Sequence, residues 1–203
     1  MRRPTSSSSR ALALVLPGRS AGRAKFAAVG HLRDEKDPLT LMRAMHLVGS
    51  DLRLAHVGAA LDPALGAEAE RTMRTCPNYR WFGALPHGAA RRRIARARAL
   101  VHASRLEGGA NVVIEALRSR VPVLASRIDG NVGLLGRDYD GTFAVGDSAG
   151  LARLMRRFAA DAPFAAHLAA QCAAREPLFR PGAERAAVRD LVFDLLAACE
   201  SAG

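Results

Sequence analysis

Two carboxylates lie within the glycine-containing stretch "SRLEGGANVVIEAL", which spans residues 104–117. Glu107 precedes the paired glycines Gly108 and Gly109, and an apolar helical pattern begins near Asn111. The first turn of a helix leaves N–H groups unpaired and carries a partial positive charge, so it attracts anions. Glycine lets the backbone approach a ligand closely, because no Cβ intervenes. The stretch therefore predicts a cradle for a phosphate group or for sugar hydroxyls.

The second carboxylate, Glu115, lies four residues after Asn111, so the two side chains share one face of the expected helix. Helical side chains lean toward the N-terminus, which directs Glu115 toward the cradle. A carboxylate there can accept two hydrogen bonds from a vicinal diol, such as that of a ribose. The alternative is an ordinary surface pairing of Glu115 with Arg118 or Ser119, and spacing alone does not decide between the two.

The elements around this stretch alternate between short apolar runs and helical patterns from residue 25 onward. The expected strands cover residues 25–30, 52–61, 79–83, 99–104, 121–126 and 141–145. The expected helices cover residues 37–49, 62–75, 86–97, 111–120, 130–136, 147–161, 163–175 and 181–198. This order predicts an α/β fold, a doubly wound parallel sheet of about six strands with helices on both faces and C-terminal helices. Ligands of such sheets bind at the carboxyl ends of the strands, where the glycine-rich stretch lies.

Arginine dominates the charge of the chain, which has a formal net charge of +11 and only two lysines, Lys25 and Lys36. Positive charge of this size is compatible with nucleic acid or phosphate partners. The basic runs are short, however, and on a helix the series from Arg91 to Arg98 forms a solvated face. No aromatic residues interleave with these arginines to stack bases, so no nucleic-acid partner is expected.

The remaining composition predicts neither a metal site nor a membrane span. Three cysteines stand far apart without a CxxC pair, and the histidines show no metal-ligand spacing. We expect no cofactor and a reducing, cytoplasmic location. The apolar run at residues 11–16 is too short to cross a bilayer. Residues 1–24 are therefore interpreted as a flexible leader or linker remnant, and residues 25–203 as one domain.

Several motifs in the same order resemble a known family. "SRLEGGANVVIEALRSRVPVLAS" is similar to the signature of the C-terminal, nucleotide-sugar-binding domain of GT-B glycosyltransferases of family 4, the glycogen synthase-like group. "VGHLRDEKDPLTLMRA", "LAHVG" and "WFG" resemble that family's preceding segments. The resemblance runs from about Phe26 to about Phe158 and implies a Rossmann-like domain, one half of a GT-B fold, which binds a UDP-sugar.

A narrower subgroup shares three further stretches. "VGHLRDEKDP", "EGGANVVIEA" and "SRIDGNVGLLGRDYDGTF" resemble the selenosugar synthases of selenoneine biosynthesis. That likeness implies transfer of N-acetylglucosamine from UDP-N-acetylglucosamine to selenophosphate, with formation of a carbon–selenium bond. The alternatives are a truncated module that binds a nucleotide sugar without catalysis, and a family 4 enzyme with another acceptor.

The resemblance also implies roles for individual residues. Lys36 would contact the donor diphosphate, Glu107 the donor sugar and Glu115 the ribose hydroxyls. The first two are the expected catalytic residues. The backbone facing sugar and phosphate would come from Gly108, Gly109, Ala110 and Asn111. Pro86 and His87 are weaker candidates for contact with the uracil base.

Two positions depart from the broad family, and both agree with the subgroup. His31 stands where the family usually has arginine, and Arg33, two residues later, is the candidate to supply that charge. Gly133, in "DGNVG", stands where the family often has glutamate after a double glycine. GT-B enzymes have two such domains, and this chain has room for the second. We therefore expect donor binding, and turnover by this chain alone stays an open question.

Overall fold

The computed structural model describes residues 24–201, and the predicted leader lies almost entirely outside them. A single six-stranded sheet forms the centre, with strand order β3-β2-β1-β4-β5-β6 and every pairing parallel. The strands are β1 (Ala24–Val29), β2 (Leu52–Val57), β3 (Tyr79–Trp81), β4 (Ala99–His102), β5 (Val123–Ser126) and β6 (Thr142–Phe143). The predicted doubly wound parallel sheet is confirmed.

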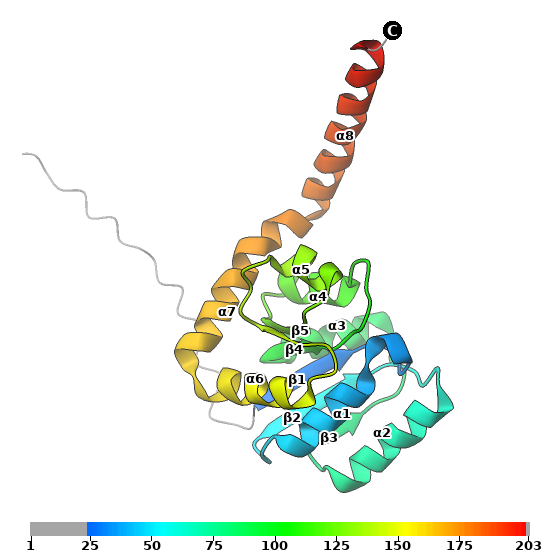
Figure 1. The fold of residues 1–203 in the computed structure, drawn as a ribbon, viewed down its shortest axis with the longest axis vertical. Coiled ribbons are helices and arrows are strands. Elements are labelled where there is room, and N and C mark those ends of the chain that lie inside the picture. The colour runs from blue at the N-terminus through cyan, green and yellow to red at the C-terminus, as the bar shows by residue number, and fades with distance from the viewer. Residues whose placement is uncertain (1–23, 202–203) are drawn as a thin grey trace, which may run out of the picture.

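Helices cover both faces of the sheet (Figure 1). On one face α1 (Pro38–Leu47) packs against α2 (Pro63–Thr75) and α6 (Ser148–Ala160). On the other, α3 (His87–Arg96) packs against β1 and against α4 (Asn111–Arg118), which contacts α5 (Asp129–Leu135). The chain then continues through α7 (Ala162–Arg175), a 3-10 turn η2 (Glu176–Phe179) and α8 (Pro181–Ser201), which extends away from the body.

Local sequence signals explain where several helices begin. The Asp62 carboxylate accepts hydrogen bonds from the backbone N–H groups of Ala64 and Leu65, and Pro63 follows at the first helical position of α2. Asp147 caps α6 in the same way through Gly150. Asp37 differs, because it adopts a left-handed conformation (φ 43°) and its carboxylate accepts from the Thr40 hydroxyl instead of the backbone.

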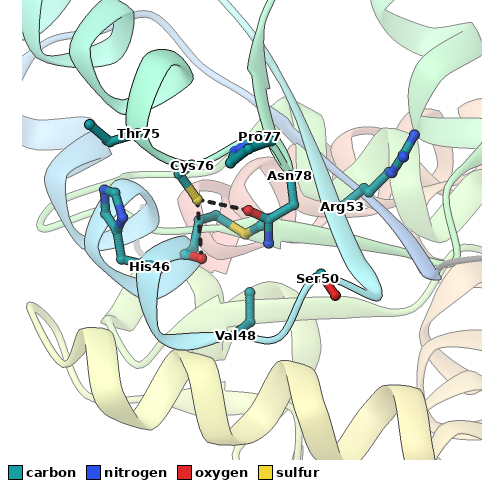
Figure 2. A pocket seen from close by; sticks show the side chains of 9 residues that line it. His46, Val48, Ser50, Arg53, Thr75, Cys76, Pro77 and Asn78 are labelled. Carbon is teal, nitrogen blue, oxygen red and sulfur yellow. Dashed lines mark hydrogen bonds between the residues drawn. The ribbon is translucent and has the colours of Figure 1, made fainter.

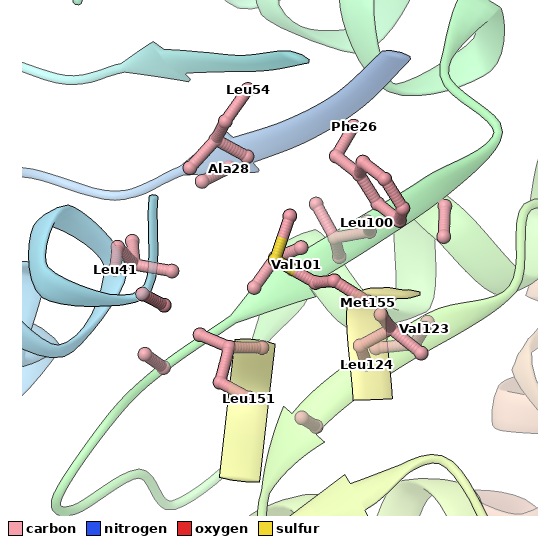
Figure 3. Close-up of a cluster of buried hydrophobic side chains, with 14 of the residues drawn as sticks. Phe26, Ala28, Leu41, Leu54, Leu100, Val101, Val123, Leu124, Leu151 and Met155 are labelled. Carbon is pink, nitrogen blue, oxygen red and sulfur yellow. The ribbon is translucent and has the colours of Figure 1, made fainter. Parts of the chain in front are cut away.

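Branched and aromatic side chains from the central strands form the core (Figure 3). Phe26 on β1, Leu100 on β4 and Leu124 on β5 are almost fully buried, and Met155 of α6 packs over them. Removing one such side chain from water contributes about 1.5–3 kcal/mol to folding. The core therefore fixes the strand ends from which the functional loops project.

The connections after the two central strands, β1 and β4, cross to opposite faces of the sheet. β1 leads to α1 on one face, while the adjacent β4 leads to α4 on the other, so the loops after these strands diverge. Such a switch point opens a crevice at the carboxyl edge of the sheet. Here the crevice lies between residues 30–37 and residues 103–110, the two segments in which the candidate residues are concentrated.

Among residues 24–201, no helix combines the length and apolarity that crossing a membrane requires. The same residues contain no group of three or more histidine, cysteine, aspartate or glutamate side chains arranged to hold a metal ion.

Candidate functional site

A cavity of about 450 Å³ lies at the carboxyl edge of the sheet, at the switch point between β1 and β4. It is large enough for a small-molecule ligand. Its walls come from the loops after β1, β2, β3 and β4 and from the first turns of α3 and α4. The lining residues are Val29, Gly30, His31, Arg33, Lys36, Val57, Gly58, Ala84, Leu85, His87, Ala90, Glu107, Gly109, Ala110, Asn111 and Val112.

Most of the residues singled out in the sequence meet in this cavity. His31, Arg33 and Lys36 come from the loop after β1, although they are 71 or more residues from Glu107 in the chain. Arg33 therefore does face the site, which its position in the sequence could not establish. Gly108, Glu115 and Pro86 are neighbours of lining residues but do not belong to the cavity wall, and Pro86 is the N-cap residue that precedes α3.

The loop after β1 is shaped by contact with the loop after β2. Gly58 has a φ of 157°, and a Cβ at this position would lie 1.9 Å from the carbonyl oxygen of Gly30. Only glycine permits this approach. A one-turn 3-10 helix, η1 (Asp34–Lys36), follows and directs the Lys36 side chain toward the β4 loop. The Arg105 backbone N–H then joins the two loops by donating to the Glu35 carbonyl at 2.8 Å.

Lys36 and Glu107 form an ion pair at the centre of the site. The Ser104 hydroxyl also donates to Glu107 Oε1, at 3.0 Å, and His102 Nε2 lies 3.7 Å from the same oxygen. Both charged side chains are mostly buried. The residues predicted to contact the donor diphosphate (Lys36) and the donor sugar (Glu107) are thus in direct contact with each other.

The electrostatics of this cluster keep Glu107 ionised. Burial disfavours the carboxylate, but hydrogen bonds from Lys36 and Ser104 and the lysine charge outweigh it, so the pKa of Glu107 lies below its ordinary value. His102 is buried, and desolvation lowers its pKa to about 4 despite the opposing effect of Glu107. At neutral pH the carboxyl group of Glu107 is therefore ionised and the imidazole of His102 is neutral.

The start of α4 supplies backbone N–H groups to the cavity. Ala110 is the residue from which the helix begins, and no side chain caps it. Gly109, Ala110 and Asn111 all line the cavity, and a Cβ added at Gly109 would meet no protein atom within 4 Å. The unpaired N–H groups and the positive end of the helix dipole therefore face the space where a ligand would lie.

Glu115 has a partner that the sequence did not indicate. Its Oε1 atom lies 2.6 Å from Nε2 of His87, which begins the neighbouring helix α3. The expected alternative, pairing with the side chain of Arg118 or Ser119, is not what the structure shows. The contact places Glu115 next to the cavity, because His87 is itself a lining residue.

Two residues that support the loop after β4 through packing and hydrogen bonds, Gly130 and Ser126, were not predicted from the sequence. A Cβ at Gly130 in α5 would lie 2.1 Å from the carbonyl oxygen of Glu107, so this glycine allows the β4 loop to rest on α5. Ser126 accepts from the Ser104 N–H at 3.0 Å and donates to the Ser104 carbonyl at 2.7 Å. Single serines and glycines carry no distinctive spacing, so only the fold could single out these two.

A second hollow, of about 300 Å³, lies at the opposite, amino edge of the sheet (Figure 2). The hollow contains the thiol of Cys76, which is within hydrogen-bonding distance of the Met45 carbonyl, at 3.3 Å, and of Asn78 Oδ1, at 2.8 Å. Burial raises the pKa of this thiol, which keeps it protonated and weakly nucleophilic. None of the residues predicted to bind a ligand lines this hollow.

Comparison with known proteins now assigns the family. The model of the family described as glycosyl transferases group 1 matches residues 17–175, most of the chain. This chain belongs to that family. A curated relative, the glycosyltransferase 1 domain-containing protein 1 of Xenopus tropicalis, is 31% identical over 119 residues. The match covers 57% of this chain and 34% of that protein, so the chain spans a minor part of the relative's length.

Several solved structures share the fold of this family member. Anabaena HepE in complex with UDP and glucose aligns with a TM-score of 0.72 at 17% identity, over 88% of this chain and 49% of HepE. Sucrose-phosphate synthase from Thermosynechococcus elongatus aligns with a TM-score of 0.72 at 25% identity, over 87% of this chain and 46% of the synthase.

The catalytic domain of cholesterol-alpha-glucosyltransferase from Helicobacter pylori gives a TM-score of 0.61 at 16% identity, over 74% of this chain and 95% of that domain. HepE and the sucrose-phosphate synthase are about twice the length that the alignment covers. The chain therefore has the architecture of one Rossmann-like half of a GT-B glycosyltransferase.

Proposed function

We propose that this chain is the donor-binding half of a glycosyltransferase and that the cavity at the β1–β4 switch point binds a UDP-sugar. The observation that carries the proposal is the convergence of Lys36, Glu107 and the uncapped start of α4 on one cavity of about 450 Å³. A cation and a helix start suit a diphosphate, and a carboxylate suits sugar hydroxyls. The solved neighbour HepE, which binds UDP and UDP-glucose, supports this ligand class.

In the proposed complex the diphosphate lies between Lys36 and the backbone of residues 109–111. Lys36 exchanges its contact with Glu107 for a phosphate oxygen, and Arg33 and His31 add donors from the same loop. His31 Nδ1 accepts from the Ala59 N–H at 3.0 Å, which leaves Nε2 as the nitrogen able to reach a ligand. Gly108 and Gly109 permit close approach of the backbone, as in the sequence prediction.

The two carboxylates then bind hydroxyl groups at the two ends of the donor. Glu107, released from Lys36 and still held by Ser104, accepts hydrogen bonds from the sugar. Glu115, near the start of α4, accepts from the ribose diol, with His87 as its neighbour. The loop at Ala84 and Leu85 forms the adjoining wall, where the base would pack. These roles make the carboxylates ligands for hydroxyls and not an acid–base pair for hydrolysis.

We further propose the reaction of the selenosugar synthase subgroup. The selenium atom of selenophosphate attacks the anomeric carbon of UDP-N-acetylglucosamine, a carbon–selenium bond forms, and the bond to the diphosphate oxygen breaks. UDP leaves with the electron pair and is stabilised by Lys36 and the helix start. The acceptor is already an anion, so no protein nucleophile is required. The subgroup motifs around Asp129 to Tyr139 support this choice of acceptor.

Thermal denaturation with added nucleotide tests the donor proposal. A ligand at 100 times its dissociation constant stabilises the fold by about 2.7 kcal/mol, which raises Tm by about 5–10 °C for a domain of this size. UDP and UDP-N-acetylglucosamine should both produce such a shift. Glu115→Ala should remove most of it, whereas Glu70→Ala, an exposed carboxylate on α2, should not. Equal shifts in all three proteins would contradict the assigned site.

A separate assay tests transfer itself. The chain is incubated with UDP-N-acetylglucosamine and selenophosphate, and the products are analysed by mass spectrometry for a selenosugar phosphate and for UDP. Product formation supports the transferase reaction. Donor binding without product supports the alternative, a nucleotide-sugar-binding module that transfers nothing by itself.

A further inference from the structure

A strongly basic surface lies on the sheet face that α3 covers. The register pairs Lys25 of β1 with Arg53 of β2, and Ala55 of β2 with Arg80 of β3. Side chains two residues apart on a strand point to the same side, so Lys25, Arg53 and Arg80 share one face. All three are exposed. The opposite side of the same strands carries core residues such as Leu54.

Helix α3 adds three more cations and closes the surface into a groove. The groove has a volume of about 480 Å³, and Lys25, Arg92, Arg93 and Arg96 line it. Its other lining residues are apolar: Phe26, Ala27, Ala55, Leu85, Ala89 and Ala97. The short alanine side chains leave the hollow between the sheet and α3. The result is a concavity with an apolar floor and a basic rim, a combination typical of small-molecule sites.

These charges have no acidic partner within residues 24–201. The sequence contains no aspartate or glutamate between Glu70 and Glu107, the segment that supplies β3 and all of α3. In the part of the chain that the structure describes, none of the six cations (Lys25, Arg53, Arg80, Arg92, Arg93 and Arg96) forms an ion pair. Like charges gathered around one hollow repel one another, and an anion bound there would relieve this repulsion.

The chemistry of the rim favours phosphate groups. Guanidinium groups present a planar fork of N–H donors that matches phosphate oxygens, and three of the four cations that line the groove are arginines. Arg93 is already oriented, because its guanidinium carbon lies 3.5 Å from the centre of the Phe82 ring. A hollow of this size suits a small molecule better than the flat surface of a membrane.

We propose that the groove between α3 and the sheet binds a small molecule carrying two or more phosphate groups. The groove is distinct from the donor cavity, which lies on the other side of α3 and is lined by His87 and Ala90 of that helix. Leu85 lines both cavities, so they adjoin through the loop after β3. The proposal is independent of the donor and acceptor assigned above, because it uses none of the same charged residues.

Inorganic tripolyphosphate is a suitable probe, with binding measured by calorimetry at 150 mM NaCl. The experiment uses a Lys36→Met background to weaken binding in the donor cavity. In that background, Arg92→Gln with Arg96→Gln should weaken tripolyphosphate binding at least tenfold. The control pair is Arg43→Gln with Arg74→Gln, exposed residues of α1 and α2 that remove the same charge. The control should change affinity less than twofold.

Replacement of Arg92 and Arg96 by lysine refines the test, since it keeps the charge and removes the guanidinium fork. Intermediate affinity is expected for this variant. Equal weakening by the Arg92/Arg96 and Arg43/Arg74 pairs would show unspecific attraction to a basic protein and overturn the proposal. Absence of tripolyphosphate binding would overturn it as well.

Two macromolecular probes test whether the groove instead binds a membrane or a nucleic acid. Vesicles containing 30% phosphatidylglycerol and a single-stranded oligonucleotide are each offered to the protein with and without tripolyphosphate. If either binds through Arg92 and Arg96 and tripolyphosphate does not displace it, the surface serves a membrane or a nucleic acid and the small-molecule proposal is wrong. UDP also carries two phosphate groups, so the donor cavity is reported by the part of UDP binding that Lys36→Met removes, because Lys36 lines the donor cavity and not the groove.

Discussion

The Lys36–Glu107 ion pair is the residue contact on which the proposed donor site depends. Both side chains are largely removed from water, and Ser104 and His102 surround the carboxylate. Removing one partner of a buried ion pair lowers the stability of the protein, because the other charge stays buried without compensation. A phosphorylated ligand avoids that cost, since its phosphate replaces the carboxylate at Lys36 and its sugar hydroxyls replace the lysine at Glu107.

This exchange predicts the behaviour of Glu107→Gln. The glutamine keeps the size of the side chain but frees Lys36, so UDP should bind at least as tightly as in the wild type. UDP-N-acetylglucosamine should lose about tenfold in affinity relative to UDP, since a hydrogen bond to a charged group contributes about 1.5–3 kcal/mol. Titration calorimetry with both ligands measures the difference. A parallel loss of UDP affinity would contradict the separation of roles, and Glu70→Gln on α2 serves as the control.

The contact between His87 and Glu115 supports a second residue prediction. His87→Ala removes the neighbour 2.6 Å from the Glu115 carboxylate, so the proposed ribose contact loses its orientation. We expect UDP to bind about three- to tenfold more weakly, while pyrophosphate, which has no ribose, binds as before. Competition against a fluorescent UDP analogue compares the two ligands. Arg91→Ala, an exposed position on the same helix, is the matched control, and equal weakening of both ligands would exclude a ribose-specific effect.

At the level of elements, the site depends on loops pressed together at the carboxyl edge of the sheet. Gly58 meets the β1 loop and Gly130 meets the β4 loop, each at a distance that a Cβ would make impossible. The Ser104–Ser126 hydrogen bonds join the loop after β4 to the end of β5. The geometry of the charged residues is therefore set by close backbone packing and not by their own contacts alone.

Helix α5 offers a controlled test of this packing. Gly130→Ala would place a Cβ 2.1 Å from the Glu107 carbonyl, so the β4 loop must move, whereas a Cβ at Gly133 in the same helix meets nothing within 4 Å. Gly130→Ala should lower the free energy of unfolding by about 1–3 kcal/mol through overpacking. Gly133→Ala should leave it unchanged or raise it, since alanine favours helices. Urea denaturation measures both. Similar effects of the two substitutions would contradict the close approach of α5 to the Glu107 backbone.

At the level of the whole molecule, two buried histidines link stability to pH. Desolvation lowers the pKa of His56 to about 4, and a hydrogen bond with the Gly30 carbonyl opposes the shift only partly. His102 is affected in the same way. Both imidazoles are therefore neutral in the folded protein near pH 5, while in the unfolded chain, with a pKa of about 6.5, they take up protons.

These histidines should therefore leave the free energy of unfolding undiminished above pH 6.5. They should lower it as the pH falls toward 4. The loss is on the order of 3 kcal/mol per histidine at pH 4, because protons bind preferentially to the unfolded chain. Urea denaturation at pH 7, 6, 5 and 4 measures the slope. His102→Gln should reduce it, and His46→Gln, on the exposed surface of α1, should not. A slope unaltered by His102→Gln would refute the assignment of that residue.

The sequence by itself determined the alternation of strands and helices, because apolar periodicity and helix caps are local properties of the chain. It also identified the glycine-rich start of α4 and the candidate residues around it, through a resemblance that the family match supports at the level of glycosyltransferases. The finer predictions of donor sugar, acceptor and residue roles stay predictions.

The tertiary structure decided which of these residues meet. Contact between Lys36 and Glu107 depends on the parallel pairing of β1 with β4, which joins segments 71 residues apart. The pairing of Glu115 with His87 and the basic groove beside α3 depend on how helices pack on the sheet. Such contacts leave no periodic trace in a single sequence, because each arises from the packing of separate elements whose local patterns are independent of one another.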